Sequence, residues 1–259
     1  MLLKEALNIK HREVISLVGG GGKTTLMFAL ARELATDDGC VITTTTTKIR
    51  QSLPQQTPHL LMARDEAELI GLFLQNTTNH RQVTLATERL TSTKLVGIHP
   101  ELVNKLADME QVTHIIVETD GAAGKSLKAP NATEPVIPTN TSLVIAVVGA
   151  DTLGCRLTEE TVFRSEIVSK LLGVPLGSFL STESIASLIT HRQGIIKGSP
   201  ERARIIPFIN KLDLCQDLSL VRNLALKILA KGHHQINMVL LGQANLPQPM
   251  VKVISGETR

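Results

Sequence analysis

The sequence contains no tryptophan or tyrosine and only five phenylalanines among its 259 residues. Proteins that bind single-stranded nucleic acid stack bases on aromatic rings, so this shortage argues against that class. The formal net charge is only +3, and no long basic run is present. Charge therefore provides no argument for nucleic acid or an anionic membrane as a partner.

Cysteines are few, and long apolar runs are missing. Cys40, Cys155 and Cys215 are dispersed without metal-ligand spacing, which predicts reduced thiols in a cytoplasmic protein. No stretch approaches the roughly 18 apolar residues of a membrane span, and the first residues lack a secretion signal. We therefore expect a cytoplasmic protein with no membrane partner.

Short apolar segments alternate with helical patterns, which predicts an α/β fold with a mostly parallel sheet and helices on both faces. The expected strands are 14–18, 40–44, 114–117, 143–148, 204–209, 237–241 and 250–254. The expected helices are 24–35, 65–74, 100–109, 161–172, 182–191 and 218–229. We expect a hairpin or edge strands at 82–98 and a loop at 53–58. A single domain over 1–259, with 150–203 as a candidate helical insertion, is the simplest organisation.

A run of four glycines lies between an apolar strand pattern and an amphipathic helix pattern. This context predicts the phosphate-binding loop of a P-loop NTPase, in which backbone amides and the helix N-terminus surround a phosphate chain. Lys23 is expected at the β- and γ-phosphates, Thr24 at Mg²⁺, and the glycines are expected to leave room for phosphate oxygens. The residues expected to bind the nucleotide here are Gly19, Gly20, Gly21, Gly22, Lys23, Thr24 and Thr25.

The loop departs from the general pattern, because Leu17 stands where its first glycine would be. The shorter form is similar to the loops of Mur-type ligases and of the SIMIBI branch of P-loop GTPases and ATPases. Deviant members of that branch carry an extra lysine before the glycines, and Val18 occupies that position here. A dimeric ATPase of the deviant kind is therefore disfavoured.

Carboxylates follow the apolar segment 114–117 directly. The carboxyl end of a parallel strand is where open α/β sheets bind ligands, and Mg²⁺ prefers hard oxygen ligands. Asp120 is the favoured metal ligand, because the next residue, Gly121, would let backbone approach a γ-phosphate. Glu118 is the alternative, as a metal ligand or as the group that positions water. The alternative without a functional role is a carboxylate that only caps a turn.

The sequence Asn210-Lys211-Leu212-Asp213 follows another expected strand. In P-loop GTPases this pattern reads guanine: the Asp carboxylate accepts hydrogen bonds that adenine cannot supply, the Asn serves the other base edge, and the Lys stem packs over the ring. A buried carboxylate left unpaired by the wrong base gives strong discrimination. We therefore prefer GTP to ATP, with Asp213 as a simple helix cap as the alternative.

Two further segments are candidates for contacts to ligands. One of the five threonines at 43–47 could complete Mg²⁺ coordination, although β-propensity explains the run equally well, and Lys48 and Arg50 could face an anionic second substrate. The polar segment 120–138 follows the candidate metal carboxylate and carries Lys125 and Lys128.

The motifs VISLVGGGGKTTLMFALA, TTTTTKI, VETDGAAGKSLKAP, EPVIP and VVGADTLG occur in this order. Together they resemble the YqeC-type family of selenium-dependent hydroxylase accessory proteins, from about residue 10 to at least residue 170. The resemblance implies a nucleotide site at residues 19–25 that also includes Asp120, Gly121, Lys125 and Lys128. Arg164 matches a position where the family usually has a His-Arg pair, but Phe163 replaces the histidine.

These inferences lead to three expected functions. The first is a Mg²⁺-dependent NTPase, preferably a GTPase, that assists maturation of a selenium-dependent molybdenum hydroxylase as its client. The second is an ATP-dependent kinase or ligase that acts on a selenium or molybdenum cofactor precursor held by Lys125, Lys128 or Arg164. The third is a scaffold that senses nucleotide without turnover. The catalytic residues expected for the NTPase are Lys23, Asp120 and Glu118.

Overall fold

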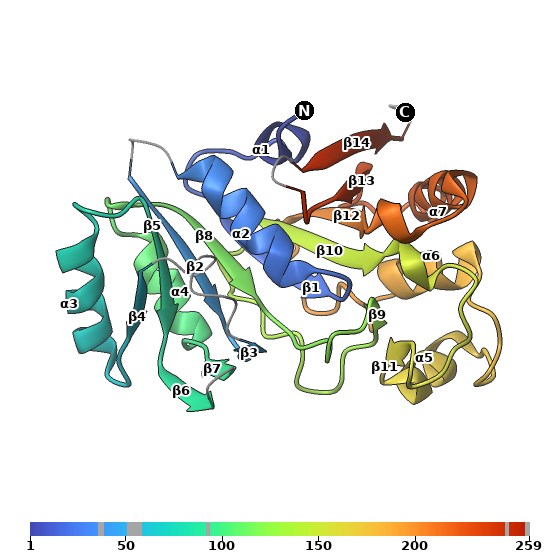
Figure 1. The fold of residues 1–259 in the computed structure, drawn as a ribbon, viewed down its shortest axis with the longest axis horizontal. Helices are drawn as coiled ribbons and strands as arrows, with labels where there is room; N and C mark the ends of the chain where they lie inside the picture. The colour runs from blue at the N-terminus through green and yellow to red at the C-terminus, as the bar shows by residue number, and fades with distance from the viewer. Residues whose placement is uncertain (36–38, 51–58, 92–93, 247–248, 257–259) are drawn as a thin grey trace.

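The computed structural model describes residues 1–35, 39–50, 59–91, 94–246 and 249–256. One nine-stranded sheet crosses the molecule in the order β14-β13-β12-β10-β1-β8-β2-β5-β4 (Figure 1). Every neighbouring pair in it is parallel except β13 and β14. Its strands are β1 (Val14–Gly19), β2 (Cys40–Thr45), β4 (Leu60–Met62), β5 (Gln82–Ala86), β8 (Val112–Glu118), β10 (Leu143–Gly149), β12 (Arg204–Asn210), β13 (Met238–Gln243) and β14 (Met250–Ser255).

Helices cover both faces of this sheet. The helices are α1 (Leu3–Ala6), α2 (Lys23–Leu34), α3 (Glu66–Asn76), α4 (Pro100–Ala107), α5 (Ser165–Leu172), α6 (Thr182–Thr190) and α7 (Leu218–Ala230). The side chains of β1 alternate between the faces: Ile15 and Leu17 pack with α1 and α2, whereas Val18 packs with α6 and α7. The predicted α/β class with a mostly parallel sheet is therefore confirmed.

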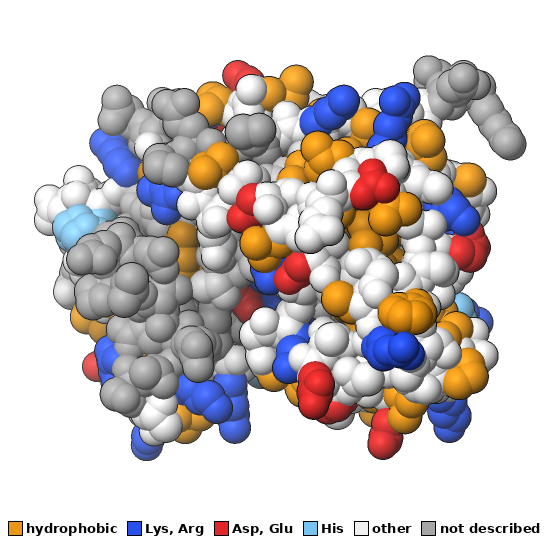
Figure 2. Space-filling model, turned by 45° about the vertical axis from the view of Figure 1, so that its right-hand side comes forward, with side chains coloured by type: hydrophobic (Ala, Val, Ile, Leu, Met, Phe, Trp, Pro, Cys, Tyr) orange, Lys and Arg blue, Asp and Glu red, His pale blue; other side chains and the backbone are white. Residues whose placement is uncertain are grey.

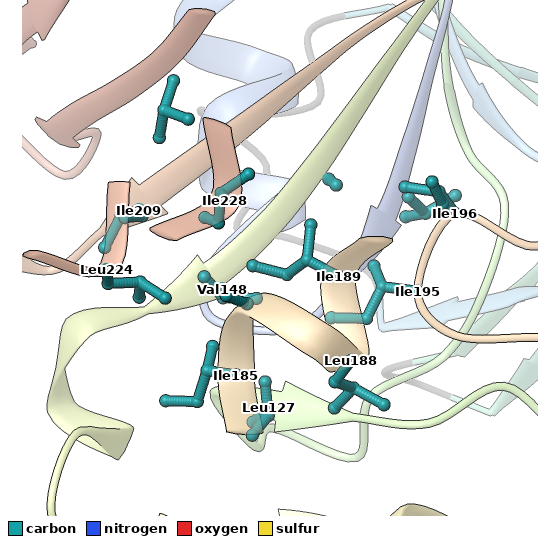
Figure 3. Packing of buried hydrophobic residues seen from close by; sticks show 14 of the residues in the cluster. Leu127, Val148, Ile185, Leu188, Ile189, Ile195, Ile196, Ile209, Leu224 and Ile228 are labelled. Carbon is teal, nitrogen blue, oxygen red and sulfur yellow. The ribbon is translucent and has the colours of Figure 1, made fainter. Parts of the chain in front are cut away.

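The core on the α6 and α7 face draws on residues from 150–203. Ile185 and Ile189 of α6 pack against Val148 of β10 and Leu127, and Leu224 of α7 joins them (Figure 3). Burying one such side chain contributes about 1.5–3 kcal/mol. The helices of this segment therefore help to hold β10, and with it the loop at the carboxyl end of β1.

Two small sheets lie beside the large one. One joins β9 (Leu127–Lys128) to β11 (Val162–Phe163), and the other has the order β3-β7-β6, from β3 (Lys48–Arg50), β6 (Glu88–Thr91) and β7 (Lys94–Val96). Two short 3₁₀ helices, Ala150–Thr152 and Leu212–Leu214, follow β10 and β12. Among the described residues, no helix combines the length and the apolar character needed to span a bilayer.

Three expectations about elements need correction. The hairpin expected within 82–98 is present as β6 and β7, but β5 is an internal parallel strand, because Val83 and Leu85 are buried. The helix expected from residue 161 begins at Ser165, since Arg164 has a left-handed backbone with a φ of 62°. The strand β4 and the helix α1 were not predicted. The expected loop at 53–58 lies outside the described residues.

Candidate functional site

The glycine loop connects β1 to α2 at the carboxyl edge of the sheet, beside the ends of β8, β10 and β12. Its glycines are packed tightly against neighbouring backbone. A Cβ on Gly21, whose φ is +81°, would lie 2.4 Å from the backbone nitrogen of Gly149, and a Cβ on Gly20 would lie 2.6 Å from the carbonyl oxygen of Lys125. The protein itself therefore requires glycine here, a reason different from the expected room for phosphate oxygens.

Hydrogen bonds fix the first half of the loop and leave the second half free. The amides of Gly20 and Gly21 donate to the carbonyls of Val147 and Lys125. Within the described residues, the amides of residues 22–25 have no acceptor. These residues are the N-cap and the first turn of α2, and they line a cleft of about 600 Å³. Free amides at the positive end of a helix dipole are a suitable environment for an anion.

Lys23 lies at the base of this cleft and is almost fully buried. Its Nζ donates a 2.6 Å hydrogen bond to the carbonyl of Gly19 and lies 3.2 Å from Asp120 Oδ1 and 3.5 Å from Glu118 Oε1. Burial alone would lower the pKa of Lys23, but the two carboxylates outweigh it and raise the pKa. The side chain is therefore a cation at neutral pH.

The two carboxylates after β8 have different environments. Glu118 lines the cleft, and its Oε2 accepts a 2.7 Å hydrogen bond from the hydroxyl of Thr24. Asp120 is only 1% exposed, and its Oδ2 accepts from the amide of Gly19 and lies 2.9 Å from Lys128 Nζ. Glu118 thus faces the cleft beside a hydroxyl, whereas Asp120 lies between two ammonium groups.

Lys128 and Arg164, which we expected near a substrate, belong to an ion network that is buried at Lys128 and half-buried at Arg164. Lys128 is fully buried, and besides Asp120 it contacts the carbonyl of Gly121 and Glu134 Oε2. Arg164 donates a 2.6 Å hydrogen bond to the same Glu134 oxygen. Burial alone would raise the pKa of Glu134, but Arg164 and Lys128 lower it. Neither Lys128 nor Arg164 lines the cleft, whereas Lys125 does.

The residues 210–213, which begin at the last residue of β12, also differ in whether they line the cleft. Asn210 is buried; its Nδ2 donates to the carbonyl of Gly21 and its Oδ1 accepts from the amide of Ala244, so it connects the glycine loop to the loop after β13. Lys211 lines the cleft and contacts Ser126 and Asp151. Asp213 is exposed and has no hydrogen-bond or ion-pair partner within the described residues.

The threonine run mainly serves the fold. Thr44 donates to the carbonyl of Leu85, Thr45 to that of Glu118 and Thr46 to that of Val136. These bonds tie β2 to its neighbours and to the segment after β9. Two relevant residues were not expected from the sequence: Glu134, the half-buried partner of Lys128, and Lys94, which lines the cleft. Glu134 opens the EPVIP motif, but that motif gives it no role, and Lys94 belongs to no motif. The one signal for Lys94 is that it is a basic residue next to the buried Leu95 in an alternating segment.

Comparisons with known proteins agree with the resemblance in the sequence. The family model described as YqeC protein matches residues 15–166, which include the glycine loop and both carboxylates. The chain is also 33% identical over 208 residues to a protein of Escherichia coli (strain K12) named "Uncharacterized protein YqeC". That match covers 80% of this chain and 79% of the relative. The chain belongs to the YqeC family.

Proposed function

We propose that this protein binds a nucleoside triphosphate with Mg²⁺ at the glycine loop and hydrolyses it. The observation that carries the proposal is the set of free amides at residues 22–25, which lie in one cleft with Lys23, Thr24 and Glu118. Backbone donors, one ammonium group and oxygen ligands are the three components that stabilise a transferring phosphoryl group. In this proposal the fold is that of a P-loop NTPase.

Thr24 and Glu118 fit a Mg²⁺ site better than Asp120 does. Their oxygens lie 2.7 Å apart at the cleft, and both are hard ligands of the kind that Mg²⁺ takes directly or through water. Asp120 is engaged by Lys23, Lys128 and the amide of Gly19, so a metal ion there would meet two cations. We therefore assign metal binding to Thr24 and Glu118, and the positioning of Lys23 and the loop to Asp120. When bound, Mg²⁺ would supply charge neutralisation at the phosphates.

Guanine is the base that we propose. Asp213 is exposed and has no partner within the described chain, so its carboxylate is able to accept hydrogen bonds from a base. Asn210 holds the start of this segment against the glycine loop through Gly21. Base recognition and phosphate binding would therefore be connected by one side chain.

The first test is nucleotide binding by calorimetry with Mg²⁺, followed by phosphate release. Wild type should bind GTP at least about tenfold more tightly than ATP, the discrimination expected when the wrong base leaves a polar group unpaired. Asp213→Ala should lose this preference, and Lys23→Ala should lose binding. Lys252→Ala, an exposed lysine on β14, is the control and should behave as wild type.

The possible results separate the three functions. Binding without any hydrolysis would replace the NTPase with a nucleotide-sensing scaffold. No binding of either nucleotide would refute the proposal altogether. An unchanged base preference in Asp213→Ala would refute guanine reading alone.

The accessory role towards a cytoplasmic selenium-dependent molybdenum hydroxylase is our proposal for the biological context, supported by the family membership.

A kinase or ligase acting on a cofactor precursor is the second candidate. It is favoured by one observation, namely that the cleft continues past Glu118 to Lys48 and Lys94 of the β3-β7-β6 sheet. Detection of a phosphorylated or adduct product, instead of free phosphate, would distinguish it from a hydrolase.

A further inference from the structure

The cleft has a second basic wall that the proposed nucleotide site does not use. Lys48 of β3 and Lys94 of β7 line it together with the glycine loop and Glu118. In the chain β3 follows β2, and β6 and β7 follow β5; their small sheet lies at the lower end of the β2, β5 and β4 side of the large sheet in Figure 1. In the large sheet β2 lies beyond β8, whereas β12, which carries the proposed base-reading segment, lies beyond β10. The basic wall and the base site are therefore on opposite sides of the glycine loop.

The register of the small sheet explains why Lys48 and Lys94 share one face. Lys48 is opposite Val96 in the antiparallel ladder, and Val96 is two residues from Lys94 on β7. Residues two apart on a strand, and residues paired across strands, occupy the same face. The alternate position, Leu95, is only 1% exposed and packs in the core. The cationic face is thus turned away from the core.

Lys48 and Lys94 differ from the other lysines of the cleft in having no partner in the part of the chain that the structure describes. Lys23 contacts Glu118 and Asp120, Lys125 donates to the carbonyl of Glu160, and Lys211 contacts Asp151. Within the described residues, the ammonium groups of Lys48 and Lys94 make no hydrogen bond or ion pair. Glu118 is the one carboxylate among the described residues that line the cleft, and it contacts Lys23 and Thr24.

Lys48 and Lys94 are diagonal neighbours on one face of the small sheet, within reach of each other for long side chains, and their like charges repel. In a cleft their fields add, and the positive potential raises the local concentration of anions. Two lysines on one face, both without a partner in the described chain, are explained if a bound anion neutralises their charges when the protein functions. Figure 2 shows that basic side chains also gather at the lower left edge of the face that it presents, whereas acidic and basic groups are interspersed further to the right.

We propose that Lys48 and Lys94 form a subsite for a second substrate, a small molecule that carries a phosphate or carboxylate group. The proposal rests on the proposed nucleotide site and gives the chemical class of the second substrate, which would be the acceptor if the protein is the kinase or ligase of the second candidate function. The subsite lies on the Glu118 side of the glycine loop, so an anion there would approach the nucleotide from the side opposite the base. A recess of about 600 Å³ that must also hold a nucleotide suits a small molecule better than a protein surface.

The test is an anion titration of protein whose glycine loop is already filled. Wild type is saturated with Mg²⁺ and a non-hydrolysable GTP analogue, and then titrated by calorimetry with inorganic phosphate in one arm and citrate in the other. Lys48→Ala, Lys94→Ala and the control Lys252→Ala follow the same protocol. Each cleft variant should bind the preferred anion about tenfold more weakly, equivalent to about 1.4 kcal/mol. Its affinity for the nucleotide analogue should stay within about twofold of wild type.

Each outcome has a defined meaning. If Lys48→Ala and Lys94→Ala lose anion binding but keep their affinity for the nucleotide analogue, the subsite is supported. The anion that wild type binds more tightly, phosphate or citrate, then identifies the group as phosphate or carboxylate. If wild type binds the nucleotide but neither anion, the subsite is refuted and the proposed function stands. If the lysine variants lose the nucleotide itself, these lysines serve the triphosphate and the subsite is likewise refuted. If wild type does not bind the nucleotide, the proposed function fails and this inference fails with it.

Discussion

The hydroxyl of Thr24 donates a 2.7 Å hydrogen bond to Glu118 Oε2, which links the first turn of α2 to the last residue of β8. The pair connects two segments that are 94 residues apart in sequence and places two oxygen ligands at the same point of the cleft. Such proximity follows from topology, because β1 and β8 are parallel neighbours whose carboxyl ends lie at one edge.

The first prediction concerns metal dependence. Thr24→Val and Glu118→Gln should each weaken Mg²⁺-dependent nucleotide binding by about ten- to hundredfold, the range typical of groups that orient a metal. The double variant should lose less than the sum of the single losses, because both side chains serve one ion. Calorimetry with Mg²⁺ and with EDTA measures the effect, which should vanish in EDTA. A loss that persists in EDTA would show that the pair only supports the fold.

Much of the fold was predictable because its strands are buried on both faces. The strands expected at 14–18, 143–148 and 204–209 are each confirmed to within one residue, since continuous apolar runs are typical of internal parallel strands. The strand β4 has only three residues, and α1 has four. Such short elements have too few residues for a period to be recognised, and they form because longer neighbours hold them.

The part of the site that is continuous in sequence was predictable from local sequence patterns. Strand, glycine loop and helix are continuous in sequence, so their geometry follows from local pattern. The roles of Glu118 and Asp120 depend on which lysines fold against each of them, and Lys128, which contacts Asp120, lies on β9, a strand paired with the distant β11. Glu134 comes from a segment without periodic signal, and the alternation around Lys94 predicts a strand but not its place beside the cleft. Long-range contacts of this kind are not encoded in spacing.

The second prediction concerns the glycine loop. Gly21→Ala should lower the free energy of unfolding by more than about 2 kcal/mol, because the left-handed backbone alone costs roughly 1–2 kcal/mol for a residue with a Cβ. The added Cβ would also lie 2.4 Å from the backbone of Gly149, which cannot move without β10. Urea denaturation measures the change.

The matched control is Gly71→Ala in α3. A Cβ there meets nothing within 4 Å and the position is helical, so stability should rise by about 0.5–1 kcal/mol. Equal effects of the two variants would contradict the tight packing of the loop.

The third prediction concerns Lys128. Lys128→Met keeps the volume of the stem but removes the ammonium group that lies 2.9 Å from Asp120 Oδ2 and 3.0 Å from Glu134 Oε2. Breaking a buried ion pair on one side costs about 3–5 kcal/mol, because the remaining charges stay buried. Urea denaturation should show this loss, and Lys252→Ala should remain within about 0.5 kcal/mol of wild type. A loss below about 1 kcal/mol would show that the network does not stabilise the fold.

The fourth prediction follows from the lowered pKa of Glu134. Burial alone would raise this pKa, but the nearby cations Arg164 and Lys128 outweigh burial and lower it. A carboxyl group with a depressed folded-state pKa adds stability that is fully present above its unfolded pKa, ordinarily 4.5, and is lost as pH falls through the folded value. The advantage of wild type over Glu134→Gln should therefore be constant from pH 7 to about pH 5.5 and shrink below about pH 4.5.

Urea denaturation at a series of pH values measures this advantage. Glu110→Gln, which removes an exposed carboxylate without a partner in the described chain, corrects for the change in net charge. The difference between wild type and Glu134→Gln must narrow on the acid side, because protonation of Glu134 removes the negative charge that both Lys128 and Arg164 contact. A difference that stays constant down to pH 3.5, or that grows, would mean that the ion network is not what lowers the pKa of this carboxyl group.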